Sequence, residues 1–213
     1  MFKTVSKLQE WQPRSALMWA VAWICGVSTA LVPVHATDLS YNYGSIGYAN
    51  FDGFDGWSGG GSYEVGGSVR IAAGVSRFDT DAFTLRTITF GAGYIARLTP
   101  EVDVIVDVGF LNAENQIAFF AVDEDEWGGF GGLSLRFAAG DRFELEPSIA
   151  YTRLFDAPLG IDEDDFVYGL TGRVLLGGRV HLEGGISGSS NSNEPTFSIG
   201  LRFGPKWRAR RTQ

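Results

Sequence analysis

Apolar residues alternate with small or polar residues along most of the chain between Tyr41 and Phe203. Successive side chains of a β-strand point to opposite faces, so this alternation predicts strands with one apolar and one polar face. The segment 102–112 is the clearest example, with valines on one face and Asp103, Asp107 and Gly109 on the other. Most alternating segments reach the roughly 9 to 11 residues that a strand needs to cross a bilayer.

The alternation and the residues that interrupt it predict ten strands. Their ranges are 40–49, 57–66, 69–78, 84–98, 102–112, 127–138, 143–154, 166–176, 179–188 and 196–203. Tight corners alternate with looser, mostly acidic connections at 50–56, 79–83, 113–126, 155–165 and 189–195. Both ends of the barrel segment should therefore lie on the tight-turn side. The fold class that we predict is all-β, an antiparallel up-and-down transmembrane β-barrel with ten strands, or eight as the alternative.

The polar face distinguishes a membrane barrel from a secreted soluble β-protein, which is the alternative. A solvated sheet usually carries many lysines, whereas Lys206 is the only lysine after residue 36.

The first strand, 40–49, does not present its aromatic residues on a single face. Other aromatic residues near the predicted strand ends suggest an interfacial girdle: Trp57, Trp127, Tyr151, Phe155, Phe166, Tyr168, Phe137, Phe143 and Phe203.

The first 36 residues have the organisation of a secretory signal peptide. Lys3, Lys7 and Arg14 precede an apolar run over 16–32, and we expect cleavage after Ala36, a membrane anchor being the alternative. The predicted domains are a signal peptide at 1–36, a barrel at 37–203 and a basic periplasmic tail at 204–213.

Cleavage would change the composition of the mature chain. It would remove Cys25, the only cysteine, and with it disulfide and thiol chemistry. It would also remove three basic residues and one acidic residue, leaving 14 basic and 24 acidic residues and a formal charge of −10. This acidic balance argues against nucleic acid as a partner.

Three short stretches carry a resemblance to a known group: the opening Tyr41-Asn42-Tyr43, the corner 98–103 and the closing segment 197–203. With the signal peptide, they resemble the small outer-membrane β-barrel proteins, OmpA-like and OmpX-like in the broad sense. More narrowly, they are similar to a ten-stranded porin-like family of xanthomonads and relatives. The resemblance implies a place in the cell outer membrane, contact with its lipid and lipopolysaccharide, and insertion by the barrel-assembly machinery. Members usually end at an aromatic residue, whereas this chain continues from Phe203 to Gln213.

Charged residues recur on the predicted inward faces, in equal numbers of acids and arginines. The acids are Glu64, Asp103, Asp107, Glu144, Glu146 and Glu183, and the arginines are Arg70, Arg86, Arg97, Arg136, Arg173 and Arg202. Unpaired charges in a narrow lumen are costly, so we expect a paired network. Such a network could be a salt-bridged plug or a thin charged pore, and the number of long arginine side chains favours the plug.

Catalytic and metal chemistry receive less support from the sequence. His181, the only histidine after residue 36, could be a base oriented by Glu183, but a hydrogen-bonding role in the lumen is favoured and we assign no catalytic residue. Two acidic loop clusters are weak candidates for Ca²⁺ or Mg²⁺, although solvated loop tips are favoured. They are Asp123, Glu124, Asp125 and Glu126, and Asp162, Glu163, Asp164 and Asp165.

The sequence thus favours a non-enzymatic outer-membrane barrel with an envelope-structural or surface-interaction role. A narrow porin for small solutes is the first alternative, and a lipid-modifying enzyme is the second. We expect a monomer without a cofactor.

Overall fold

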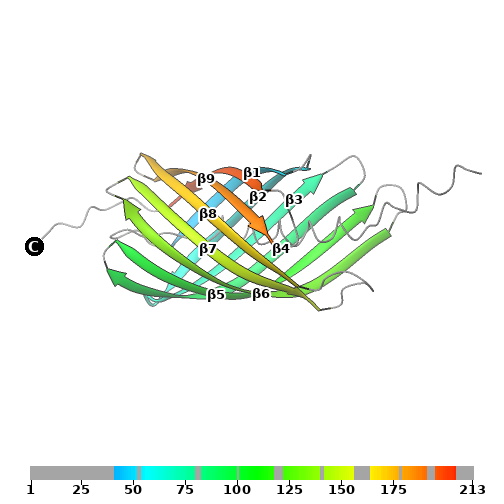
Figure 1. The fold of residues 1–213 in the computed structure, drawn as a ribbon, viewed down its shortest axis with the longest axis horizontal. Coiled ribbons are helices and arrows are strands. Elements are labelled where there is room, and N and C mark those ends of the chain that lie inside the picture. The colour runs from blue at the N-terminus through cyan, green and yellow to red at the C-terminus, as the bar shows by residue number, and fades with distance from the viewer. Residues whose placement is uncertain are drawn as a thin grey trace, which may run out of the picture.

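A computed structural model describes residues 41–51, 54–79, 83–99, 101–117, 122–139, 142–155, 164–177, 179–190 and 195–204. Within these ranges the chain forms one closed antiparallel barrel (Figure 1). Its strands are β1 (Tyr43–Phe51), β2 (Phe54–Val65), β3 (Val69–Asp79), β4 (Phe83–Thr99), β5 (Val102–Ile117), β6 (Val122–Ala139), β7 (Phe143–Leu154), β8 (Asp164–Gly177), β9 (Val180–Ser189) and β10 (Thr196–Phe203). The predicted all-β, ten-stranded up-and-down barrel is confirmed. In this part of the chain, no helix is long and apolar enough to cross a membrane.

Each strand pairs with its neighbours in sequence, and β1 closes the ring by pairing with β10 from Gly44↔Phe203 to Asn50↔Phe197. The strands are tilted around a common axis (Figure 1), as closure of a small barrel requires. The corner between β2 and β3 is a tight turn in which Gly66 and Gly67 have φ of 65° and 84°. Glycine takes this backbone region without steric cost, which explains the Gly-Gly pair at that corner.

The exterior of the barrel is apolar on every strand. Val108 of β5, Ile199 of β10 and Tyr168 of β8 are 61%, 56% and 59% exposed, and the other seven strands contribute similar outward side chains. A soluble monomer rarely exposes a contiguous apolar patch larger than a few hundred Å². A surface that is apolar around the whole ring instead suits contact with lipid acyl chains.

The structure also resolves the face of the first strand. In β1, Ile46 and Tyr48 point outward and are about half exposed, whereas Tyr43 and Ala49 point inward and are buried. The predicted girdle residues Trp57 and Trp127 lie on the outer surface near the loop ends. The predicted start of this strand at residue 40 is wrong, because regular pairing begins at Tyr43.

The prediction of a loop at 113–126 is wrong, because β5 and β6 continue through most of this segment. Their pairing extends from Ala113↔Glu126 to Ile117↔Val122. Aspartate and, less strongly, glutamate are depleted in strands, and the run of acids therefore predicted a loop. Backbone pairing between two long neighbouring strands outweighs that preference here.

Candidate functional site

Two buried arginines join a row of charged side chains, here called the arc, along the lumen wall at the tight-turn end. Arg136 of β6 bonds Asp103 of β5 at 2.8 Å and Glu144 of β7 at 3.0 Å. Arg173 of β8 bonds Glu146 of β7 at 2.7 Å and Glu183 of β9 at 3.1 Å. Both arginines are 0% exposed. Each guanidinium therefore spans from its own strand to both neighbouring strands, which is the geometry that a planar group with several N–H donors supplies.

The arc continues to β10 and ends beside β1. The Arg202 guanidinium lies 3.8 Å from a Glu183 carboxylate oxygen and 4.0 Å from the centroid of the Tyr43 ring. At this distance the ring face attracts the cation. The wall from β5 round to β1 thus carries alternating acids and arginines near the turns.

The remaining part of this end is occupied by Tyr41, which precedes β1. Its hydroxyl donates to Asp103 Oδ2 of β5 at 2.9 Å, and its backbone N–H donates to Glu64 of β2 at 3.2 Å. The side chain is 0% exposed and forms a buried cluster with Ile95 and Ile105. Tyr41 therefore reaches across the lumen, because β1 and β5 are separated by three intervening strands of the ring.

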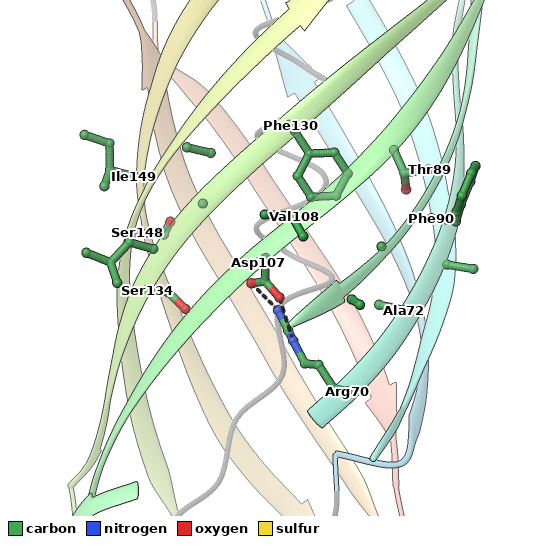
Figure 2. A pocket seen from close by; sticks show the side chains of 16 residues that line it. Arg70, Ala72, Thr89, Phe90, Asp107, Val108, Phe130, Ser134, Ser148 and Ile149 are labelled. Carbon is green, nitrogen blue, oxygen red and sulfur yellow. Dashed lines mark hydrogen bonds and ion pairs between the residues drawn. The ribbon is translucent and has the colours of Figure 1, made fainter. Parts of the chain in front are cut away.

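A second ion pair lies further toward the loop side. Arg70 of β3 bonds both carboxylate oxygens of Asp107 of β5, at 2.9 and 2.5 Å (Figure 2). The pair crosses β4 at Gly93, since Arg70, Gly93 and Asp107 are in register on three consecutive strands. A Cβ at Gly93 would lie 2.0 Å from Asp107 Oδ1. Glycine at this position is thus what allows the two side chains to meet.

Beyond this pair the lumen contains a cavity (Figure 2). Its volume of about 60 Å³ is enough for several water molecules. The inward ring of Phe130 lies over Gly109, where an added Cβ would come within 2.5 Å of the ring. The remaining inward wall is built mainly of small residues from β3, β4, β6 and β7: Ala72, Thr89, Gly91, Gly132, Ser134, Ser148 and Ala150.

An apolar layer follows the cavity toward the loops. Phe78, Leu85, Leu111 and Leu154 point inward and are at most 3% exposed. Leu111 and Leu154 both reach over Gly128, where a Cβ would meet them at 3.2 and 3.1 Å. The lumen is therefore layered, with paired charge near the turns, small residues in the middle and apolar side chains near the loops.

Most of the residues predicted to line the lumen lie on inward faces near the tight turns. Arg97 and Glu64 pair there at 2.8 Å, and Arg97 also donates to the Gly67 carbonyl. The inward position predicted for Arg86 is wrong, because its side chain points outward and lies 3.8 Å from Glu114. The alternation in β4 puts Leu85 and Thr87 inside, so the residue between them must lie outside.

His181 lies on the inward face of β9 beside Arg202 of β10, with which it is in register. It is 5% exposed and belongs to the charged layer at the turn side. A substrate approaching from the loop side would meet the apolar layer first. His181 therefore lies inside the lumen near the turns, and its predicted hydrogen-bonding role stays a prediction.

The two acidic clusters predicted to lie in loops are partly in strands, because β6 and β8 extend further than predicted. Asp165 belongs to β8, is 1% exposed, and accepts hydrogen bonds from Ser189 at 2.6 Å and Ser190 at 2.7 Å. Asp164 accepts one from the Tyr151 hydroxyl at 2.9 Å. Long strands carry these carboxylates into contact with neighbouring strands, which local charge density cannot reveal.

The other acids of these clusters have different locations. Glu126 is in β6 and is 5% exposed. Asp123, Glu124 and Asp125 are in the same strand, and their side chains fall outside the described part of the structure, as do residues Asp162 and Glu163. Within the described ranges, no group of three or more histidine, cysteine or acidic side chains is placed to hold a metal ion. The Ca²⁺ or Mg²⁺ site stays a prediction.

Sequence reasoning missed four aromatic residues of the lumen: Tyr41, Tyr43, Phe78 and Phe130. The two tyrosines were missed because the face of the first strand was ambiguous. Phe130 shares its parity with Ser134 and Arg136 on β6, and that spacing could have identified it as inward.

Comparison with known proteins finds only distant likenesses to other β-barrels. No family model matches the chain, and no curated protein matches it in sequence. Among solved structures, the KdgM porin is 6% identical at a TM-score of 0.46, covering 76% of this chain and 98% of that chain. The translocator domain of the autotransporter NalP from Neisseria meningitidis is 14% identical at 0.45, covering 88% and 97%. The NanC porin is 8% identical at 0.44, covering 76% and 98%. At these values the likenesses carry no statement about a shared pore, ligand or activity.

The decisive observation lies in the chain itself, where ten antiparallel strands close into a ring that is apolar outside and charged within. The chain has the fold of a small outer-membrane β-barrel. The narrower resemblance to the ten-stranded porin-like family stays a prediction.

Proposed function

We propose that this protein is a non-enzymatic barrel of the bacterial outer membrane whose role is structural in the envelope or is the presentation of a surface. The predicted signal peptide and the apolar exterior support this location. The lipid and lipopolysaccharide that surround such a barrel are its proposed partners, together with the machinery that inserts it. A closed lumen is what separates this role from that of a porin.

The observation that carries the proposal is the pair of two-carboxylate bridges at Arg136 and Arg173. Their ion pairs are 2.7 to 3.1 Å long and the arginine side chains are 0% exposed. Opening such a network to a solute would separate charges in a poorly solvated space, and removing one partner of a buried pair costs about 3–5 kcal/mol. Thermal motion alone would therefore open this layer only rarely.

Planar-bilayer recording tests whether the lumen is closed. Refolded wild-type protein should insert without sustained conductance steps, whereas the double variant Arg136→Ala, Arg173→Ala should conduct if it still shows heat-modifiable gel migration. The variant Arg86→Ala is the matched control, because it removes an outward-facing arginine and should stay closed. Sustained steps from wild-type protein would overturn the closed-lumen proposal.

A narrow channel is the second candidate, and the cavity of small residues is the observation that favours it. The cavity already provides space in the middle of the membrane-spanning region. Conduction would then require the charged layer on one side and the apolar layer on the other to open. The same recordings decide between the two candidates.

A further inference from the structure

We propose that Tyr41 is a latch that closes the turn-side entrance to the lumen cavity, and that its release opens a path from that side to the cavity. This inference rests on the closed lumen of the proposed function and names the element that can open it.

The position of Tyr41 fits a latch because its side-chain contacts lie across the lumen, on β4 and β5. The residue precedes β1, yet its hydroxyl bonds Asp103 of β5 and its ring packs with Ile95 of β4 and Ile105 of β5. The Arg97 guanidinium also approaches the ring, with 6.0 Å between its central carbon and the ring centroid. Together with the Arg97–Glu64 pair of β4 and β2, this side chain covers the sector from β1 to β5, which the arc of Arg136, Arg173 and Arg202 does not reach.

The cavity lies directly behind this side chain. Asp103, Ile105 and Asp107 follow one another on the inward face of β5, and Tyr41 contacts the first two. Asp107, with its partner Arg70, lines the cavity. Movement from the turn side to the cavity along this wall must therefore pass the position of Tyr41.

Release of Tyr41 would leave the rest of the barrel intact. The pairing of β1 begins at Tyr43 with β2 and at Gly44 with β10, so Tyr41 is outside the strand ladder. Asp103 Oδ2, which accepts the tyrosine hydroxyl, also accepts a hydrogen bond from Arg136 at 2.8 Å. The carboxylate would therefore keep a charged partner after the tyrosine leaves, which avoids the cost of a buried unpaired charge.

The test measures access to the cavity with a thiol reagent. Cysteine introduced at Ala72, an inward residue of the cavity wall, is labelled with a small membrane-impermeant methanethiosulfonate in refolded full-length or mature barrel carrying no other cysteine. If the latched state is populated to about 90% or more, Tyr41→Ala should raise the labelling rate about tenfold or more. Tyr41→Phe keeps the packing but loses the hydroxyl, and should raise the rate a few-fold, since a single hydrogen bond to Asp103 is lost. Tyr63→Ala is the control, because Tyr63 is 59% exposed on the outer face.

An unchanged labelling rate in folded Tyr41→Ala would overturn the latch. If that variant does not fold, Tyr41→Phe decides, and a rate equal to that of the unsubstituted barrel would overturn the proposal. A rise in the Tyr63→Ala control as well would also overturn it, because the effect would then reflect general loosening. Failure of the proposed function is seen separately, as sustained conductance of the wild-type barrel. A closed wild-type barrel with no response to Tyr41 substitution overturns the latch alone.

Discussion

Substitution of Gly93 tests whether a glycine in β4 permits the ion pair that crosses it. In Gly93→Ala the new Cβ would lie 2.0 Å from Asp107 Oδ1 and 2.8 Å from Arg70 Nε. Neither distance is tolerable, so the Asp107 carboxylate must rotate away. Rotation would break two hydrogen bonds to Arg70, of 2.9 and 2.5 Å.

The expected loss follows from these contacts. The side chains of Arg70 and Asp107 are 3% and 13% exposed, so solvent screens the pair weakly. Overpacking costs about 1–3 kcal/mol, and disruption of a buried ion pair costs up to about 3–5 kcal/mol when one partner is removed. Both charges remain in Gly93→Ala and can find new partners, and alanine gains about 0.5–1 kcal/mol over glycine in a strand. We expect a net loss of about 2–4 kcal/mol in the free energy of unfolding.

The assay is urea unfolding of the refolded barrel in lipid vesicles, followed by gel migration. Gly132→Ala is the matched control, because it is also inward but its Cβ would meet its nearest neighbour at an ordinary 3.5 Å. A double-mutant cycle with Asp107→Ala isolates the clash, since the carboxylate is then absent and Arg70, no longer bonded to it, can move away from the new Cβ. In that background, Gly93→Ala should cost little.

Two results would refute the reasoning. Gly93→Ala could prove as stable as Gly132→Ala, which would mean that the Arg70–Asp107 pair does not depend on the missing side chain at Gly93. Alternatively, its cost could be undiminished in the Asp107→Ala background, which would place the strain elsewhere in the strand.

Two further substitutions separate the inside of the barrel from the outside. Arg136→Ala should lower the free energy of unfolding by about 3–5 kcal/mol, because Asp103 and Glu144 lose their shared cation. Arg86→Ala should lower it by less than about 1 kcal/mol, because the ion pair that it removes is exposed. Equal losses for the two variants in vesicle unfolding would contradict the assigned faces. Val108→Arg, at an outward position 61% exposed near the middle of β5, should cost about 2–4 kcal/mol in lipid. Tolerance of this arginine, with Val108→Leu as control, would instead favour a soluble β-protein.

The sequence predicted the parts of the fold that depend on local alternation. In β5 each valine from 102 to 108 and each acid between them takes the face that the period of two assigns. Where two faces contain similar residues, as in β1, no such assignment was possible. The inward position predicted for Arg86 is wrong, because its neighbours Leu85 and Thr87 are both inward.

Strand ends were predicted less well than strand interiors for a physical reason. Acidic residues lower local strand propensity, yet Glu126 and Asp165 lie in strands because a neighbouring strand is already paired beside them. Pairing across a barrel is a long-range property that the composition of one segment does not contain.

The sequence by itself determined that the chain makes a ring with an even number of antiparallel strands, apolar outside and charged inside. The reason is that a β-strand displays its two faces directly as alternation in its sequence. Tertiary structure alone decided which charges meet. Barrel closure, tilt and register place Arg70 opposite Asp107 with Gly93 between them, and bring Tyr41 to Asp103 across the lumen. Partners separated by one or more strands are fixed by the geometry of the closed sheet, so no local pattern along the chain can specify them.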